Sequence, residues 1–126
     1  MSLRTITILA AVILAGVVCV YAADITGTWT TQFDSQVGLQ KYTFEFKVDG
    51  TKLTGRALSN IAGADAKTEL TEGKINGDEV TFVENLKYQE MDLKITYKGK
   101  ISGDEIKFQR TVGDSGGEEF VAKRAK

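Results

Sequence analysis

Apolar and polar residues alternate with a period of two along most of the chain after residue 24. Between Leu93 and Ile101, for example, every odd position except Gly99 is apolar and every even position is polar. This alternation predicts a β-strand with one buried face. The pattern recurs along the chain, so we expect eight strands, over residues 25–33, 40–48, 52–60, 67–76, 79–88, 92–101, 105–112 and 118–124.

Two twelve-residue segments are near repeats of one another, GKINGDEVTFVE at 73–84 and GKISGDEIKFQR at 99–110. Each has a glycine at its centre, Gly77 or Gly103, between two arms of alternating character. Glycine readily takes the positive φ that a tight hairpin turn needs, and the flanking Asn, Ser and Asp residues bond to the local backbone. The repeat therefore predicts one β-hairpin that is used twice.

The connections between the predicted strands are local, and the chain contains no proline. We predict an all-β fold, a single antiparallel up-and-down barrel of about eight strands, because closure leaves no strand edge exposed. A two-sheet β-sandwich is the alternative. The longer connections are predicted at 34–40, at 61–66 (a turn or a short helix) and at 113–117.

The N-terminus has the pattern of a secretory signal peptide over residues 1–22, with cleavage before Ala23. Arg4 precedes an apolar run, Ile6 to Val20, which is too short to span a membrane. Cys19 would be the anchor of a lipoprotein, but Val18 before it fits that signal poorly. We therefore expect a secreted or periplasmic bacterial protein, with residues 23–126 forming the β-barrel domain and no membrane association after cleavage.

The charged residues, 16 basic and 17 acidic, are interspersed along the chain and form no basic stripe for nucleic acid. The sequence contains no histidine, so the commonest general base and metal ligand is missing. We expect no cofactor, no metal and no catalytic residue. An acid/base role of Glu84 in a carboxylate-based hydrolase stays as an alternative, although such chemistry needs a second carboxylate.

Two charged residues, Glu84 and Arg110, fall on predicted inward faces at matching places in the two repeats. A buried charge must be paired or hydrogen-bonded. They pair with each other, or Arg110 lies over the ring of Trp29, or both form the polar floor of a ligand cavity. Arg124 is the other candidate to pack on Trp29 near the end of the chain.

Aromatic residues fall almost entirely on inward faces, which favours a filled barrel or one with a small cavity. Tyr42, Tyr88 and Tyr97 lie near predicted strand ends, where a hydroxyl and a ring edge can face a ligand. Together with Glu84 and Arg110 they are the candidate ligand-binding residues, whereas Trp29 and Arg124 have structural roles. In the 34–40 connection, Val37 and Leu39 are apolar residues that could close a mouth or touch a partner.

Gly27-Thr28-Trp29 on the first strand resembles calycin-type barrels, which include lipocalins and the avidin group. Asp49-Gly50 and Leu53-Thr54-Gly55 resemble the avidin-like second and third strands, but biotin binding needs tryptophans beyond Trp29. Most of the mature chain is similar to a small secreted bacterial domain that occurs alone or attached to secreted esterases and glycoside hydrolases. The segments that carry this similarity are Gly27-Thr28-Trp29, Gln40-Lys41-Tyr42-Thr43-Phe44, Leu53-Thr54-Gly55, Gly103-Asp104-Glu105-Ile106-Lys107-Phe108 and Glu119-Phe120-Val121-Ala122-Lys123-Arg124.

The resemblance implies an extracytoplasmic accessory or binding role close to carbohydrate-degrading enzymes. The expected function is therefore non-catalytic binding of a carbohydrate or another small ligand. The alternatives are a lipocalin-like carrier of a small apolar ligand, and a module that binds or inhibits a secreted enzyme through its loops. A cavity favours the carrier, and exposed aromatic residues at the mouth favour the carbohydrate binder.

Overall fold

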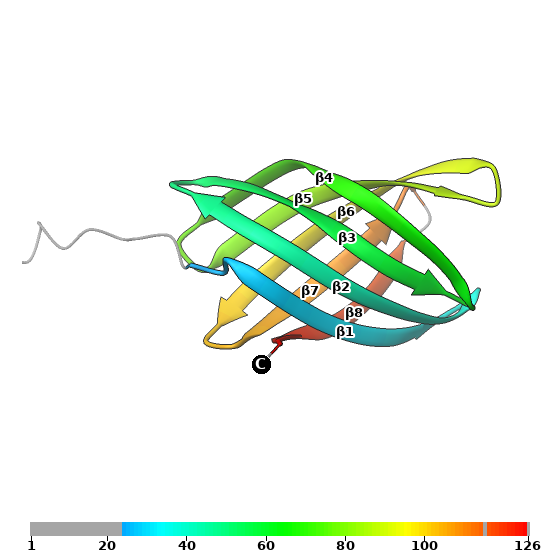
Figure 1. The fold of residues 1–126 in the computed structure, drawn as a ribbon, viewed down its shortest axis with the longest axis horizontal. Coiled ribbons are helices and arrows are strands. Elements are labelled where there is room, and N and C mark those ends of the chain that lie inside the picture. The colour runs from blue at the N-terminus through cyan, green and yellow to red at the C-terminus, as the bar shows by residue number, and fades with distance from the viewer. Residues whose placement is uncertain (1–23, 115, 126) are drawn as a thin grey trace, which may run out of the picture.

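The structure, a computed structural model, describes residues 24–114 and 116–125. Eight antiparallel strands follow one another around a closed barrel (Figure 1). This confirms the predicted up-and-down barrel, which is compatible with a calycin-like fold, and the β-sandwich alternative was wrong. The strands are β1 (Gly27–Ser35), β2 (Gly38–Asp49), β3 (Lys52–Ile61), β4 (Ala64–Asn76), β5 (Glu79–Tyr88), β6 (Met91–Ser102), β7 (Glu105–Val112) and β8 (Gly117–Arg124).

The predicted signal peptide and Cys19 lie outside the described residues. Within the part of the chain that is described, no helix is long and apolar enough to cross a membrane.

The 34–40 connection is shorter than predicted, because β1 continues to Ser35 and β2 already begins at Gly38. The Ser35 hydroxyl donates to the Gly38 carbonyl oxygen at 2.9 Å and accepts from the Val37 amide at 3.3 Å. These two bonds satisfy backbone groups within the turn, so Gln36 and Val37 alone connect the strands.

The 61–66 segment contains a two-residue turn, Ala62 and Gly63, and no helix. Ala62 and Gly63 both have positive φ values, 50° and 91°, and Ile61 pairs directly with Ala64. This is the geometry of a two-residue type I′ hairpin, whose twist matches that of the flanking strands.

The two sequence repeats form the β4–β5 and β6–β7 hairpins. Gly77 and Gly103 occupy the first position of each two-residue turn with φ values of 61° and 60°. Glycine takes this conformation without the steric cost that a Cβ atom imposes. The β4–β5 hairpin also has a register shift in β4 between Thr71 and Lys74, where Glu72 has positive φ.

The barrel interior is filled largely by aromatic rings in stacked and edge-to-face contact. Phe82 and Tyr97 stack with their ring centroids 4.6 Å apart, and Phe33 and Phe120 do the same. Phe44 packs against the first pair, 5.6 Å from the rings of both Phe82 and Tyr97, and Phe108 joins this pair to Phe120. Such contacts leave little empty space along this part of the barrel, in agreement with the many inward rings of the sequence.

One end of the barrel is closed by Trp29, which is fully buried. The Arg124 guanidinium lies over the indole with its Cζ 4.6 Å from the ring centroid. It also donates to the Asp104 carboxylate at 3.1 Å and to the backbone carbonyl oxygens of Thr26 and Asp24 at 3.0 and 3.2 Å. Of the two arginines that the sequence left as alternatives, Arg124 therefore packs on Trp29, and Arg110 does not.

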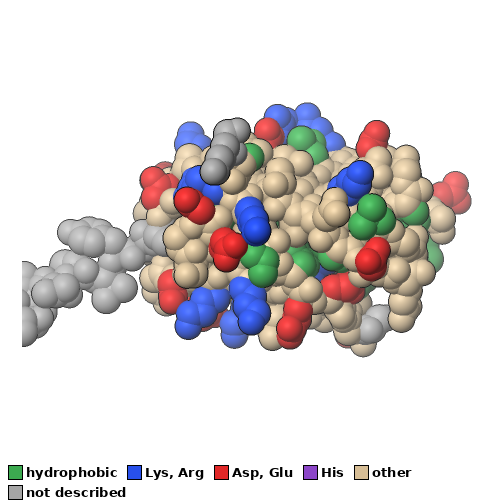
Figure 2. Space-filling model, turned by 90° about the horizontal axis from the view of Figure 1, so that it is seen from below, with side chains coloured by type: hydrophobic (Ala, Val, Ile, Leu, Met, Phe, Trp, Pro, Cys, Tyr) green, Lys and Arg blue, Asp and Glu red, His purple; other side chains and the backbone are tan. Residues whose placement is uncertain are grey.

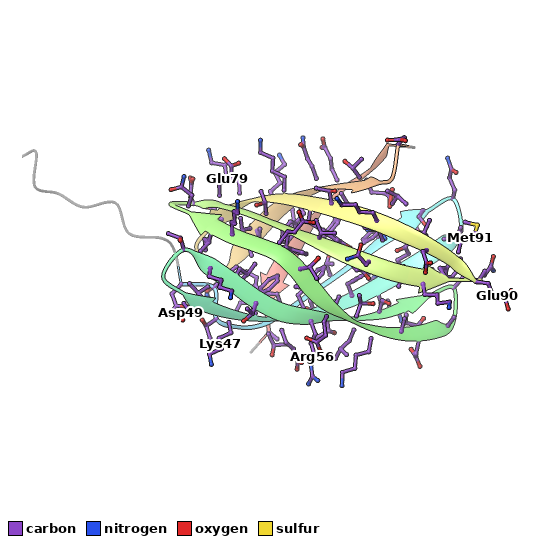
Figure 3. All side chains as sticks on the ribbon, turned by 90° about the horizontal axis from the view of Figure 1, so that it is seen from above. Lys47, Asp49, Arg56, Glu79, Glu90 and Met91 are labelled. Carbon is purple, nitrogen blue, oxygen red and sulfur yellow. The ribbon has the colours of Figure 1, made fainter. Side chains whose placement is uncertain are left out.

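The turns divide between two ends. In Figure 3, Asp49 and Glu79, beside the β2–β3 and β4–β5 turns, lie at one end, whereas Glu90 and Met91 of the β5–β6 turn lie at the other. Figure 2 shows basic and acidic side chains mixed on the face in view. The end that carries the β1–β2, β3–β4, β5–β6 and β7–β8 turns is called the mouth below.

Candidate functional site

The mouth of the barrel contains a pocket of about 420 Å³. It lies between the β1–β2 turn, the β5–β6 hairpin and the segment that joins β7 to β8. This volume falls within the range of natural small-molecule sites. The lining residues are Asp34, Ser35, Gln36, Val37, Gln40, Ile61, Leu86, Tyr88, Leu93, Arg110, Val112, Gly116, Gly117 and Glu118.

Arg110 belongs to a buried polar network that extends from the pocket into the barrel. Its Nε donates to the Tyr97 hydroxyl at 3.0 Å, and its Nη2 donates to the Tyr42 hydroxyl at 3.2 Å. Both hydroxyls in turn donate to the Glu84 carboxylate, Tyr97 at 2.7 Å and Tyr42 at 3.1 and 3.2 Å from its two oxygens. The positive and the negative group are thus joined through two tyrosines, an arrangement in which each hydroxyl acts as donor and acceptor.

The direct pair of Glu84 and Arg110, one of the alternatives from the sequence, is therefore wrong. The carboxylate that contacts Arg110 is Glu118, whose Oε1 accepts from Nη1 at 2.7 Å. Arg110 and Glu118 are opposite each other on β7 and β8, so cross-strand register places them together. The inward direction of both Glu84 and Arg110 was predicted correctly, since both side chains are buried.

Tyr42 and Tyr97 are buried inside the barrel, whereas the sequence placed them near its ends. Their hydroxyls bind Glu84 and do not reach solvent. Tyr88 alone of the three tyrosine candidates lines the pocket. The structure therefore brings Glu84, Arg110, Tyr42 and Tyr97 into one network below the pocket and leaves Tyr88 at its wall.

Burial sets the ionisation of this network. Loss of water raises the pKa of Glu84, although hydrogen bonds from Tyr97 and Tyr42 and the charge of Arg110 oppose the rise. Burial and then the Glu84 charge raise the pKa of Tyr42 to about 12 and that of Tyr97 well above its usual range. Both tyrosines are consequently neutral hydrogen-bond donors at physiological pH.

Two polar residues that the sequence analysis did not single out, Gln40 and Ser59, are also buried. Gln40 Oε1 and Ser59 Oγ have no hydrogen-bond partner among the described residues. Counting back by twos from Tyr42 would have placed Gln40 on the inward face. The prediction missed it because Gln40 stands at the boundary that the predicted 34–40 connection shares with the predicted 40–48 strand.

Three apolar side chains are exposed around the mouth. They are Val37 in the β1–β2 turn, Leu39 at the start of β2 and Met91 at the start of β6, with exposed fractions of 48%, 41% and 57%. Val37 also lines the pocket.

The described residues contain no group of three or more His, Cys, Asp or Glu side chains arranged to hold a metal ion. The comparisons with protein-family models, curated proteins and solved structures find no significant match to this chain.

Proposed function

We propose that this protein is a non-catalytic binding barrel that takes a small, partly apolar ligand into its mouth. The observation that carries the proposal is the pocket itself, an open cavity whose lining combines five aliphatic side chains and Tyr88 with polar residues, among them the paired Arg110 and Glu118. Natural ligand sites combine these two features, because apolar walls supply affinity and a few polar groups fix orientation.

The lining favours a carrier of an amphiphilic molecule over a carbohydrate binder. Sugars bind by stacking on exposed aromatic rings, and Tyr88 is the one aromatic residue among the described residues of the lining. The wall is supplied instead by aliphatic side chains, Val37, Ile61, Leu86, Leu93 and Val112.

Glu84, the candidate acid/base residue, gives no support to catalysis. Its carboxylate is fully buried and accepts hydrogen bonds from Tyr42 and Tyr97, so it lies beneath the pocket and holds the network together. We assign it a structural role in keeping Arg110 in position.

The proposal includes a secreted or periplasmic location and a kinship with calycin-type barrels. The pattern of residues 1–22 supports the location, and Gly27-Thr28-Trp29 supports the kinship. Trp29 and Arg124 close the end opposite the mouth, an arrangement that suits a barrel open at one end.

The pocket volume gives an order-of-magnitude ligand size and concentration range for binding experiments. At roughly 30 Å³ per water molecule, 420 Å³ corresponds to about 14 water molecules, and so to a ligand of about a dozen non-hydrogen atoms. At about 0.3 kcal/mol per atom such a ligand binds with a free energy near −4 kcal/mol, a Kd of about 1 mM. Screening therefore requires millimolar ligand.

The test is a thermal-unfolding screen of the purified protein with medium-chain alcohols, amines, fatty acids and oligosaccharides. A ligand at ten times its Kd stabilises the folded state by about 1.4 kcal/mol, which should raise Tm by about 6–10 °C. Leu93→Trp, which fills part of the pocket from a half-buried position, should abolish the shift. Val121→Trp, on an exposed position outside the pocket, should retain it.

Two results would contradict the proposal. One is the absence of any Tm shift across the panel. The other is a shift that survives Leu93→Trp unchanged, which would place binding elsewhere on the molecule.

A second candidate function is contact with a partner protein, such as a secreted hydrolase, through the mouth. The exposed apolar side chains of Val37, Leu39 and Met91 favour it. In that case Met91→Ser should weaken the association with the partner without changing small-ligand binding, because Met91 does not belong to the pocket lining.

A further inference from the structure

The Arg110 guanidinium is fixed in position by the interior of the barrel. Tyr42 and Tyr97 each donate their only hydroxyl proton to the Glu84 carboxylate. Toward Arg110 the two hydroxyls can therefore only accept, and they do so from Nε at 3.0 Å and from Nη2 at 3.2 Å. The rings of Phe33, Tyr42 and Tyr97 lie 5.3, 5.5 and 5.8 Å from its Cζ. These contacts hold the cation in place from inside the barrel, independently of what the pocket contains.

The edge of the guanidinium at Nη1 is covered, among the described residues, by Glu118 alone. A guanidinium has five N–H groups, and three of them have acceptors here, one each on Nε, Nη2 and Nη1. Nη1 donates to Glu118 Oε1 at 2.7 Å, and this is the single bond between the two side chains. A carboxylate can form two parallel bonds with an arginine, so this pair does not use the full binding capacity of Arg110.

Glu118 is much less confined than the cation that it contacts. Its side chain is 24% exposed, against 3% for that of Arg110. It is the second residue of β8, and at this end β8 pairs with β7, whereas its described pairing with β1 is confined to its other end. Its carboxylate makes no hydrogen bond to another described residue. Rotation of the Glu118 side chain can therefore carry its carboxylate into water at the loss of one bond.

Exchange of Glu118 for another carboxylate leaves the charge next to Arg110 unchanged. When Glu118 turns outward as an anion enters, the guanidinium keeps one directly bonded carboxylate and Glu118 regains its hydration. A cation has no equivalent exchange. It would take Glu118 away from Arg110 and leave a buried charge without its direct partner, or it would bind the exposed Asp34 at the rim, where water weakens the attraction.

We propose that Arg110 is the anion subsite of the mouth pocket, that Glu118 occupies it in the free protein, and that the ligand is an amphiphile whose carboxylate displaces Glu118. This inference rests on the proposed binding function. Arg110 and Glu118 line the same pocket as the five aliphatic side chains, so one space receives both the acid group and the apolar body. Glu118 is then an internal competitor, and the apparent affinity for the anion is reduced by the fraction of molecules in which Glu118 has left.

The experiment compares octanoate with octanamide, which has the same apolar chain and the same number of non-hydrogen atoms but no charge. Kd values are measured by NMR titration of the purified protein with millimolar probe. Glu118→Gln removes the competing carboxylate and leaves the buried network intact. In this variant octanoate should bind about tenfold more tightly than in the wild type, the value of one hydrogen bond to a charged group, whereas the Kd of octanamide should change by less than about twofold.

Glu119→Gln is the matched control. It removes the same charge one residue further along β8, from an exposed side chain outside the pocket lining. Its Kd for octanoate should stay within about twofold of the wild-type value, because water and salt screen an exposed charge. The comparison separates loss of the contact with Arg110 from the change in net charge. The ratio of the two Kd values on one variant is also insensitive to a general loss of stability.

The outcomes separate this inference from the proposed function. If neither probe binds, or Leu93→Trp does not alter binding, the mouth is not the binding site and both proposals fail. If octanamide binds in the mouth but Glu118→Gln raises the affinity for octanoate no more than Glu119→Gln does, the binding function stands and the anion subsite is overturned. Octylamine should bind the wild type more weakly than octanoate, and the reverse order would overturn the inference in favour of the acidic residues as the recognition groups.

Discussion

At the scale of single residues, the Glu84 carboxylate should make stability depend on pH. Its folded-state pKa lies above the ordinary value of 4.5, first because of burial. The folded state therefore holds the proton more tightly than the unfolded chain. The resulting stabilisation is complete below pH 4.5 and is lost as the pH rises through the raised folded-state pKa.

The measurement is the free energy of unfolding in urea at stepped pH values from about 4.5 upward. The free energy of unfolding of the wild type should fall as the pH rises through this window. Glu84→Gln removes the titrating group, so its free energy of unfolding should not show the part of the fall that Glu84 causes. Glu119→Gln, an exposed carboxylate on β8, is the control and should follow the wild type. Parallel wild-type and Glu84→Gln curves would show that Glu84 does not titrate in this window.

The face on which a residue lies was predictable, but its depth and its partner were not. Period-two counting placed Glu84 and Arg110 inside because alternation follows directly from strand geometry. It could not show that Tyr42 and Tyr97 lie between them, because depth in a barrel depends on the tilt and stagger of the strands. The partner Glu118 depends on the register of β7 against β8, which the sequence of neither strand reveals.

At the scale of the secondary-structure element, Gly99 is the residue of β6 that lets Phe108 pack against the backbone. A Cβ atom at Gly99 would lie 2.6 Å from Phe108 Cε1 and 2.7 Å from Ile106 Cγ2, and both side chains are fully buried. Gly99→Ala should therefore lower the free energy of unfolding by about 1–3 kcal/mol through overpacking.

Urea unfolding provides the measurement, with Thr96→Ala on the exposed face of the same strand as the control. The control should change stability by less than about 0.5 kcal/mol. A neutral or stabilising Gly99→Ala would mean that Phe108 moves away without cost, contrary to the tight packing described here.

The strands themselves were predicted to within a few residues. Their bounds are set by alternation and by turn glycines such as Gly77 and Gly103, which are local signals. The 34–40 segment was predicted as one of the longer connections, between strands at 25–33 and 40–48. The structure keeps all but Gln36 and Val37 in strands, since the Ser35 hydroxyl satisfies the turn backbone.

At the scale of the whole molecule, closure of the barrel depends on the seam between β1 and β8. Among the described residues, ladder pairing across this seam is confined to Trp29 with Arg124 and Thr30 with Lys123. Side chains supplement it. Thr31 Oγ1 donates to the Val121 carbonyl oxygen at 2.8 Å, and Arg124 donates to backbone carbonyl oxygens of the segment before β1.

Arg124→Leu should therefore loosen the seam and destabilise the barrel by about 2–4 kcal/mol, the combined value of a cation–π contact and hydrogen bonds to a charged group. Wild-type Trp29, being fully buried, should fluoresce at short wavelength, and the variant should emit at longer wavelength. Lys123→Leu, an exposed neighbour on β8, should leave the emission unchanged. Water-exposed emission from the wild type would exclude Trp29 as the plug of the closed end.

The bond between Arg124 and the Asp24 carbonyl oxygen has a practical consequence for orientation. It places the start of β1 and the end of β8 side by side, at the end of the barrel remote from the pocket (Figure 1). A tether attached before Asp24 or after Arg124, whether to a sensor surface or to a fused protein, therefore leaves the mouth pointing away from the support. Immobilised in either way, the barrel presents the same opening to solution.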